Sequence, residues 1–345
     1  MVNKTFQEIR GQYEALQKSL DYLKEEMPRI REVINSKAYS RIIFLGCGSS
    51  YNVAQSMAQI SKTVLRVNAE AYPAGDLLLH ISRYLSFIEN ALIVTISRSG
   101  NTTEIVLAVE AIKKSTNNVV LSITCAPKNQ LSKLSDISLD MPWAFDESVC
   151  QTRTVTCFYG IGLALIALLG DRGDMLSAIQ RAMEKGPEML QTYEKKLEEV
   201  ARFPWKDVAV LADAELEGIA GEGALAFKEI CQLPSNYYHV LDCRHGPMVM
   251  IKPQTLVIIA LSDGNTYETG LINDLYRKKC TIVAYSDFNI NLPEKVLQVN
   301  SEEKLPHAVR GIPFILICQL LAYYKALING IDPDNPDGLD PWIKL

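Results

Sequence analysis

The sequence predicts an α/β protein made of two copies of one unit, each a parallel sheet with helices on both faces. From Arg41 onward, short runs of aliphatic and β-branched residues alternate with amphipathic stretches, which is typical of strands and helices in such a sheet. The chain also resembles itself at a nearly fixed spacing, which indicates a repeated structural unit. Its 345 residues are enough for two domains.

Two independent pairs of segments carry the internal repeat. Residues 92–104, LIVTISRSGNTTE, align with LVIIALSDGNTYE 164 positions later, and G-N-T-x-E recurs in place. Residues 41–58 align with residues 207–224, at a spacing of 166. Because the two spacings nearly agree, we expect two α/β units, a first unit over residues 37–182 and a second unit over residues 200–330.

The elements can be placed in order along the chain. Residues 1–36 have apolar residues three or four apart, which predicts an N-terminal helical segment that packs on a domain or on a partner subunit. Residues 42–46 predict a strand, and the turn C-G-S-S then leads into a helix that ends near residue 65. We also expect strands at 91–96 and 119–124 and helices at 102–114 and 153–169. A charged helical stretch, 183–203, leads to the second unit, and residues 331–345 form a C-terminal tail.

Composition and charge narrow the class of protein. With 48% apolar and 22% charged residues, the chain resembles an ordinary globular protein, and its net charge of −5 does not favour nucleic acid as a partner. The first residues lack a signal-peptide core, and the longest apolar run, residues 157–170, is too short to span a bilayer. The eight cysteines are scattered without C-x-x-C pairs, which indicates reduced core thiols in the cytoplasm. We expect no membrane partner.

Hydroxyl-rich turns follow two strands of the first unit. Ser97, Ser99 and Thr102 follow one strand, and Ser49 and Ser50 follow another. The first N–H groups of a helix lack internal partners and carry the positive end of the helix dipole, so such turns bind anions, most often phosphate. Both turns would meet at the carboxyl edge of one sheet. The alternative is that the serines are only helix caps.

The second unit has carboxylates where the first has hydroxyls. Asp213, Glu215 and Glu217 stand at its first turn, and Asp263 takes the place of Ser99. A carboxylate at a helix N-terminus repels a phosphate while still favouring the dipole. We therefore assign anion binding to the first unit.

Two candidates for proton transfer lie in the second unit. His245 stands in R-H-G-P, a rigid turn, where an imidazole can act as acid or base near neutral pH, or has no role at all. Glu229 lies seven residues after Glu222 on a helix whose other faces are apolar. Partial burial would raise the pKa of such a carboxyl and suit it to proton transfer; alternatively, it is a solvated glutamate paired with a lysine. No metal-ligand spacing or nucleotide loop occurs, so we expect no metal and no cofactor.

In order along the chain, the motifs C-G-S-S, S-R-S-G-N-T, E-G-A-L-x-x-K-E and R-H-G-P resemble the sugar isomerase (SIS) family. More narrowly, they resemble the isomerase half of glucosamine-6-phosphate synthase (glutamine–fructose-6-phosphate aminotransferase) and the stand-alone fructosamine-6-phosphate deglycases, over about residues 37–345. This resemblance implies two tandem SIS units of three-layer αβα, flavodoxin-like architecture.

The resemblance also implies roles for the matching residues. The residues implied to hold the sugar phosphate are Ser49, Ser50, Ser97, Ser99 and Thr102, and those implied to line the sugar are Val149 and Gln151. Glu229 would move a proton between C1 and C2, and His245 would assist ring opening. In the family that histidine reaches in from a neighbouring subunit, so a homodimer or higher even oligomer is implied. Arg98 stands where the synthase has glutamine, and it adds a cation that can meet the phosphate or an acidic substrate group.

Departures from the synthase pattern indicate the reaction. The synthase begins with a nucleophilic cysteine after Met1, whereas this sequence has Val2, and no glutaminase half precedes the SIS units. Ala226 stands in place of a synthase lysine, and the Schiff-base lysine of the synthase tail aligns with Pro341, with Lys344 nearby but shifted in register. A deglycase needs neither lysine, because its substrate already carries nitrogen on C1.

We therefore expect deglycation of a fructose-amine 6-phosphate to glucose 6-phosphate and free amine. Other enzymatic interpretations stay open: an aldose–ketose isomerase, an amino-sugar-phosphate deaminase, or a synthase-like isomerase without a glutaminase domain. From a different class, the chain could be a non-catalytic sugar-phosphate sensor.

Overall fold

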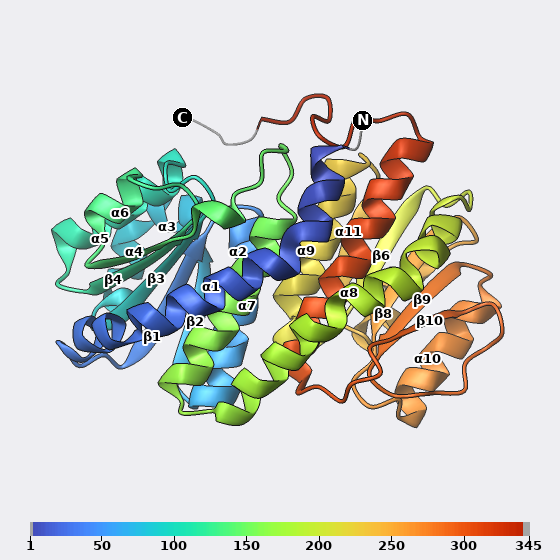
Figure 1. Ribbon diagram of the computed structural model, residues 1–345, viewed down its shortest axis with the longest axis horizontal. Helices are drawn as coiled ribbons and strands as arrows, with labels where there is room; N and C mark the ends of the chain where they lie inside the picture. The colour runs from blue at the N-terminus through green and yellow to red at the C-terminus, as the bar shows by residue number, and fades with distance from the viewer. Residues whose placement is uncertain (1–2, 341–345) are drawn as a thin grey trace. The chain divides into compact units, whose positions relative to one another are not determined.

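A computed structural model describes residues 3–340 (Figure 1). The tail positions Pro341 and Lys344 lie outside the described residues. The chain forms two compact units, each with its own sheet. The first-sheet unit comprises Glu14–Glu147 and Gln151–Leu176. The second-sheet unit comprises Ser148–Cys150, Ser177–Leu339 and the N-terminal residues up to Tyr13.

The first sheet is parallel throughout, with the strand order β2-β1-β3-β4-β5. Its strands are β1 (Arg41–Gly46), β2 (Asn68–Pro73), β3 (Ala91–Ser97), β4 (Val119–Thr124) and β5 (Ile137–Asp140). Every residue of β3 and β4 is buried, as expected for central strands covered on both faces.

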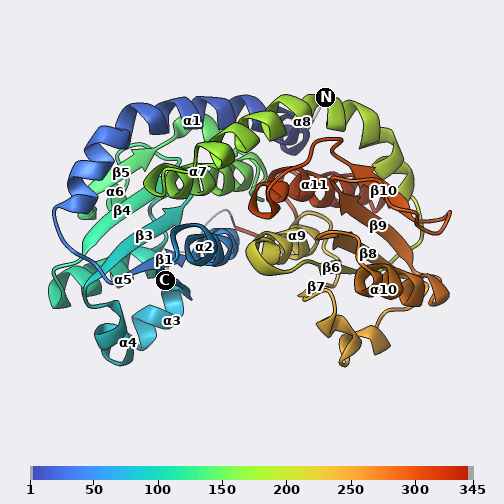
Figure 2. The same ribbon diagram turned by 90° about the horizontal axis from the view of Figure 1, so that it is seen from below.

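Helices cover both faces of the first sheet. Figure 2 shows the sheet between α7 (Arg153–Leu169) and the group formed by α3 (Ala74–Leu79), α4 (Ile81–Ile88) and α5 (Thr103–Ser115). The remaining helical segments are α2 (Ser49–Ile60), a π-helical turn (Ser61–Leu65), α6 (Gln130–Leu134) and a 3-10 turn (Pro142–Ala144). One core cluster joins Ile43 and Ile93 of the sheet to Leu77 and Val109 of the covering helices.

The second sheet has the strand order β10-β9-β8-β6-β7, again all parallel. Its strands are β6 (Asp207–Leu211), β7 (Ser235–Tyr238), β8 (Thr255–Ala260), β9 (Thr281–Ser286) and β10 (Leu297–Asn300). Listed from its β7 edge, this is the order of the first sheet, and both have the flavodoxin-like order 2-1-3-4-5. Corresponding strands begin 160 to 167 positions apart. The predicted fold class is confirmed.

Figure 2 shows the second sheet between α11 (Gly311–Ile328) and α10 (Thr266–Arg277). Helix α9 (Glu217–Ile230) packs closely on α11, since a Cβ at Gly223 would lie 2.7 Å from the Cys318 sulfur. Two longer helices complete the chain: α1 (Lys4–Asn35) and α8 (Gly173–Ala201).

One sequence expectation needs correction. The charged helix starts at Gly173 rather than near residue 183, because Met175, Ala178 and Ile179 continue its buried stripe. Residues 157–170 are the longest uninterrupted apolar run, but a longer helical stretch, interrupted by Arg310, Gln319 and Lys325, is also strongly apolar. Within residues 3–340, His307–Ile328 is the one helical stretch long and apolar enough to cross a membrane by length and composition. Of its 18-residue apolar window, 83% is buried inside the protein, and a buried core helix passes the same test.

Candidate functional site

The two hydroxyl-rich turns of the first-sheet unit lie at the same edge of the sheet. Strand β1 pairs in parallel with β3, so the residues that follow each strand emerge side by side. Four serines in these turns are buried, each with 7% or less of its surface exposed: Ser49, Ser50, Ser97 and Ser99. Buried hydroxyls at the ends of adjacent parallel strands are well placed for a polar ligand.

The turn after β1 depends on two glycines. A Cβ at Gly46 would lie 2.4 Å from the backbone carbonyl carbon of Ser50, so only glycine allows this close approach. Gly48 has φ 54° and ψ −125°, a conformation that L-residues rarely adopt. Gly48 is also the N-cap of α2 and provides no side-chain cap, so the N-cap here is not a serine.

The turn after β3 is shaped by its own hydroxyls. Ser97 Oγ accepts the Gly100 N–H at 3.1 Å, and Ser99 Oγ accepts the Asn101 N–H at 3.1 Å. The Asn101 Oδ1 accepts the N–H of Gln130, the first residue of α6, at 3.0 Å. Thr102 is the N-cap of α5, and its side chain makes no cap hydrogen bond. The positive end of this helix therefore has no side-chain cap of its own.

Arg98 lies within this turn and is buried, with 4% of its surface exposed. Its guanidinium carbon sits 5.6 Å from the centre of the Phe145 ring, a cation–π contact. Its carbonyl oxygen accepts the Cys125 N–H at 3.0 Å, which ties the turn to the end of β4.

The two residues implied to line the sugar belong to the segment before α7. The Gln151 Oε1 is buried and accepts no hydrogen bond within the part of the chain that the structure describes. Val149 belongs to the second-sheet unit, where its N–H donates to the Asp334 carbonyl at 3.0 Å. Its neighbour Ser148 donates its N–H to Glu8 Oε1 at 3.1 Å. The orphan amide oxygen of Gln151 is the more informative of the two, because a buried acceptor is costly unless a donor reaches it.

The candidate acid–base residues lie in the second-sheet unit. Glu229 is partly buried near the end of α9, and Ala226 and Phe227 beside it are buried. His245 is exposed in the loop after β7, between two 3-10 turns, Asp242–Arg244 and Pro247–Val249. Its N–H donates to the Asp242 carbonyl at 2.8 Å.

Arg244, the cation beside His245, forms an ion pair with a neighbouring helix. The Arg244 guanidinium donates to Asp274 of α10 at 2.6 and 3.1 Å. Gly246, the next residue along the loop, has φ 126°, which suits glycine. The loop is therefore anchored to α10 through Arg244, and the imidazole is exposed.

Sequence reasoning missed a polar cluster at the carboxyl ends of β6 and β7. His239 Nδ1 lies 3.0 Å from Asp213 Oδ1 and 3.0 Å from the Tyr237 hydroxyl, and His307 Nε2 lies 3.2 Å from the Asp213 carbonyl. Only the run Y-Y-H after a strand hints at it in the sequence. Among residues 3–340, no group of three or more His, Cys, Asp or Glu residues could hold a metal ion.

Comparison with known proteins gives one family and several relatives. Residues 36–166 match the family described as SIS domain. D-galactosamine-6-phosphate deaminase AgaS of Shewanella sp. is 28% identical over 88% of this chain and 79% of its own length. Glutamine–fructose-6-phosphate aminotransferase (isomerizing) of Sulfurisphaera tokodaii is 24% identical over 96% of this chain. The chain spans about half the length of the curated aminotransferases, 55% in this case.

Among solved structures, glucosamine-6-phosphate deaminase from Thermotoga maritima superposes with a TM-score of 0.82 and 26% identity. The match covers 99% of this chain and all of the deaminase chain. The likeness therefore extends over both sheets.

Proposed function

We propose that this chain, whose residues 36–166 belong to the SIS domain family, is an enzyme that moves a proton between C1 and C2 of a phosphorylated amino sugar and releases the amine. The observation that carries the proposal is the pair of buried serine turns after the adjacent strands β1 and β3. The similarity to deaminases of amino-sugar phosphates supports the same class of substrate.

The phosphate ester is assigned to the two serine turns. Both α2 and α5 begin there without a side-chain cap, so their N-terminal dipoles favour an anion. The hydroxyls of Ser49, Ser50, Ser97, Ser99 and Thr102 supply donors, and Arg98 adds a positive charge. The orphan Gln151 Oε1 supports a ligand as well, because a sugar hydroxyl can donate to it.

The chemistry we propose is deglycation of a fructose-amine 6-phosphate. Ring opening exposes the C2 ketone, and Glu229 takes a proton from C1 to give an enaminol. Return of the proton to C2 gives a C1 aldimine. Water then adds to the aldimine carbon and the C–N bond breaks, which yields glucose 6-phosphate and the free amine. This chemistry needs neither of the two synthase lysines, which align with Ala226 and Pro341 in this sequence.

Ring opening is assigned to His245. Its imidazole is exposed, which fits a role in which one chain of a homodimer supplies it to the other. The eight free cysteines, seven of them buried, fit a reducing compartment, which we take to be the cytoplasm.

Deamination is the second candidate, favoured by the 28% identity to AgaS. In that case the same base takes the proton from C2 of an aldose carrying a 2-amino group. Protonation at C1 then gives a C2 imine, and its hydrolysis releases ammonia and a ketose 6-phosphate. Both reactions use one base and one proton transfer, in opposite directions along C1–C2.

A substrate panel distinguishes these reactions. Fructose-amino-acid 6-phosphates, galactosamine 6-phosphate and glucosamine 6-phosphate are each offered, and glucose 6-phosphate and ammonia are measured separately. Deglycation predicts glucose 6-phosphate without ammonia, whereas deamination predicts ammonia. If no compound turns over while sugar phosphates still raise the melting temperature, the chain is a sensor and the enzymatic proposal is wrong.

Glu229→Gln tests the base on whichever substrate is accepted. We expect turnover to fall at least 100-fold, since general acid–base catalysis contributes roughly 10²–10⁴-fold, while substrate affinity stays within a factor of a few. Glu217→Gln is the matched control, because it removes a carboxyl from the start of the same helix. Full turnover in Glu229→Gln would show that another residue is the base.

A further inference from the structure

The second-sheet unit contains its own copy of the turn after β3. Residues 261–266, L-S-D-G-N-T, follow β8 as residues 97–102, S-R-S-G-N-T, follow β3. The backbones agree at the glycine, with φ 68° at Gly264 and φ 61° at Gly100. Both turns lead into a helix whose second or third residue is a glutamate, Glu268 and Glu104. They are therefore equivalent turns in two equivalent units.

The two turns differ in what their backbone amides bind. In the second-sheet unit, the Glu268 carboxylate accepts the N–H groups of Ser262 at 2.6 Å, Asp263 at 3.3 Å and Gly264 at 2.7 Å. The glutamate is buried, with 4% of its surface exposed. Three successive amides around one anionic group form an oxyanion cradle, the arrangement that binds phosphates in other proteins. We call Ser262–Gly264 the β8 cradle.

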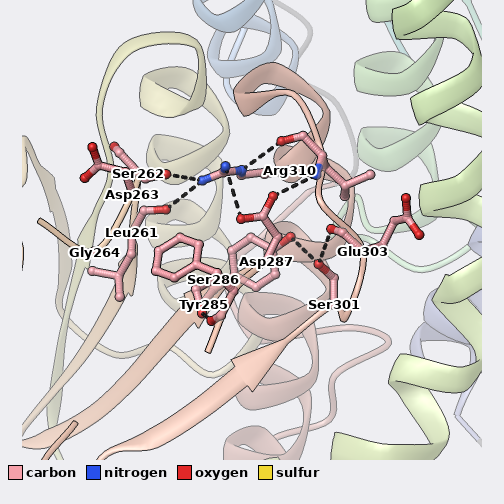
Figure 3. A network of polar contacts seen from close by, with 12 residues as sticks. Leu261, Ser262, Asp263, Gly264, Tyr285, Ser286, Asp287, Ser301, Glu303 and Arg310 are labelled. Carbon is pink, nitrogen blue, oxygen red and sulfur yellow. Dashed lines mark hydrogen bonds and ion pairs between the residues drawn. The ribbon is translucent and has the colours of Figure 1, made fainter. Parts of the chain in front are cut away.

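The opposite side of the β8 cradle is held by a cation. Figure 3 shows Arg310 donating to the carbonyls of Leu261, at 3.0 Å, and Ser262, and pairing with Asp287 at 3.1 Å. Asp287 in turn accepts the Leu305 N–H at 2.7 Å. The carbonyl side of the loop therefore faces a buried guanidinium while its amide side faces a buried carboxylate. Both sets of backbone dipoles are satisfied by charges from the chain itself.

The turn after β3 in the first-sheet unit makes different contacts. There the Gly100 N–H donates to Ser97 Oγ. The residue equivalent to Ser97 in the second unit is Leu261, whose side chain has no hydrogen-bond acceptor. Glu104 Oε2 is buried and has no hydrogen-bond partner among residues 3–340. The asparagine differs too: Asn265 caps α10 by accepting two N–H groups, whereas Asn101 binds the Gln130 N–H.

We propose that Glu268 is the resident anion of the β8 cradle, and that it closes the second-sheet unit to phosphate, so that the chain binds one phosphate group. A phosphate could enter only by displacing a tethered, buried carboxylate from all three amides. Without that displacement, the two anions would repel each other across a few ångströms. The sequence attributes the exclusion to carboxylates such as Asp263, but the Asp263 carboxylate accepts from Asn265, whereas the Glu268 carboxylate accepts from the three amides.

Glu268→Ala tests the proposal by emptying the cradle. Equilibrium dialysis with radiolabelled inorganic phosphate, at constant ionic strength set with chloride, counts the bound anions per chain. We expect one more bound phosphate in Glu268→Ala than in the wild type. We also expect a melting temperature that drops in chloride and recovers in phosphate. Glu110→Ala is the matched control, since it removes a helical glutamate that pairs with Lys114, and its phosphate count should equal the wild-type value.

The result separates this inference from the proposed phosphate site in the first-sheet unit. One phosphate in the wild type and two in Glu268→Ala support both. None in the wild type and one in the variant support the β8 cradle and refute the first site. Equal counts in the two proteins, with no extra thermal recovery, overturn the inference.

A measurement on the wild type keeps the test decisive if Glu268→Ala does not fold. Hydrogen–deuterium exchange of the amides of residues 262–264 should be slow, and about 50 mM phosphate should leave the exchange rate unchanged. The amides of residues 98–100 should become slower in the same buffer if the first site is right. Phosphate-dependent slowing at residues 262–264 in the wild type would show that the ligand displaces Glu268 and would refute the proposal.

Discussion

Replacing Gly48 by alanine isolates the backbone geometry of the turn after β1. Gly48 has φ 54° and ψ −125°, and a Cβ built there meets no atom within 4 Å. The cost of the methyl group is therefore conformational, with no clash against neighbours. Residues held in such sparsely populated regions cost about 1–3 kcal/mol. The turn either keeps its shape at that cost or relaxes and moves the amides that begin α2.

Two measurements together capture this energy. If the turn keeps its shape, the free energy of unfolding of the first-sheet unit falls by about 1–3 kcal/mol. If the turn relaxes, the affinity for a phosphate ester falls instead, by roughly 5- to 150-fold for the same energy. Denaturant unfolding gives the first quantity, and calorimetric titration with fructose 6-phosphate gives the second. We expect their combined loss to lie in this range.

The second-sheet unit supplies a matched control. Ala214 occupies the position equivalent to Gly48 and also has φ 54°, a strained conformation for an L-residue. Ala214→Gly removes that strain but makes the unfolded chain more flexible, so we expect a gain of at most about 1 kcal/mol. Phosphate-ester affinity should not change. Wild-type stability and affinity in Gly48→Ala, or weaker binding in Ala214→Gly, would refute the reasoning.

Three further predictions concern other features. Asp287→Ala leaves the buried Arg310 without its carboxylate, so urea denaturation should show that the free energy of unfolding falls by about 3–5 kcal/mol. The double variant Asp287→Ala/Arg310→Met should recover part of this loss, and an unchanged midpoint in Asp287→Ala would contradict the prediction. Asp334→Ala removes the carboxylate that accepts the N–H groups of Lys4 and Thr5 at 2.9 and 2.8 Å, so thermal unfolding should show a loss of about 1 kcal/mol that Asp334→Asn largely avoids. Burial, with a smaller contribution from Glu104, raises the pKa of the Cys47 thiol to about 12. At pH 8, native protein should therefore label with iodoacetamide far more slowly than urea-unfolded protein, and the labelling rate of native protein should keep rising with pH up to that pKa. Equal rates in native and unfolded protein would contradict the prediction.

Central strands were predictable because they are buried on both faces. Strand β4 was expected at 119–124 and is observed at Val119–Thr124, and α7 was expected at 153–169 and is observed at Arg153–Leu169. Edge strands gave no such signal. Strand β2, N-A-E-A-Y-P, has a single fully buried residue, Ala69, and β5, β7 and β10 have four residues each. Pairing with a neighbour, rather than local sequence, defines these strands.

The site was predictable in its chemistry and not in its contacts. Glycine and serine after a buried strand mark an anion turn in any sequence of this kind. The motif G-N-T-x-E, however, is the same in both units. It cannot show that Glu268 accepts three amides of its turn while Glu104 Oε2 is buried without a hydrogen-bond partner among residues 3–340. The difference depends on a leucine at 261 in place of a serine and on Arg310, which lies more than forty residues further along. Only the folded chain brings these together.

The carboxylate in the β8 cradle has a consequence for how duplicated units diverge. A unit whose turn amides bind an external ligand gains stability only when that ligand is present, by mass action. A unit that carries its own anion is equally stable at every metabolite concentration. Thermal stability that varies with the supply of phosphorylated metabolites should therefore be confined to the half of the chain that kept its serines.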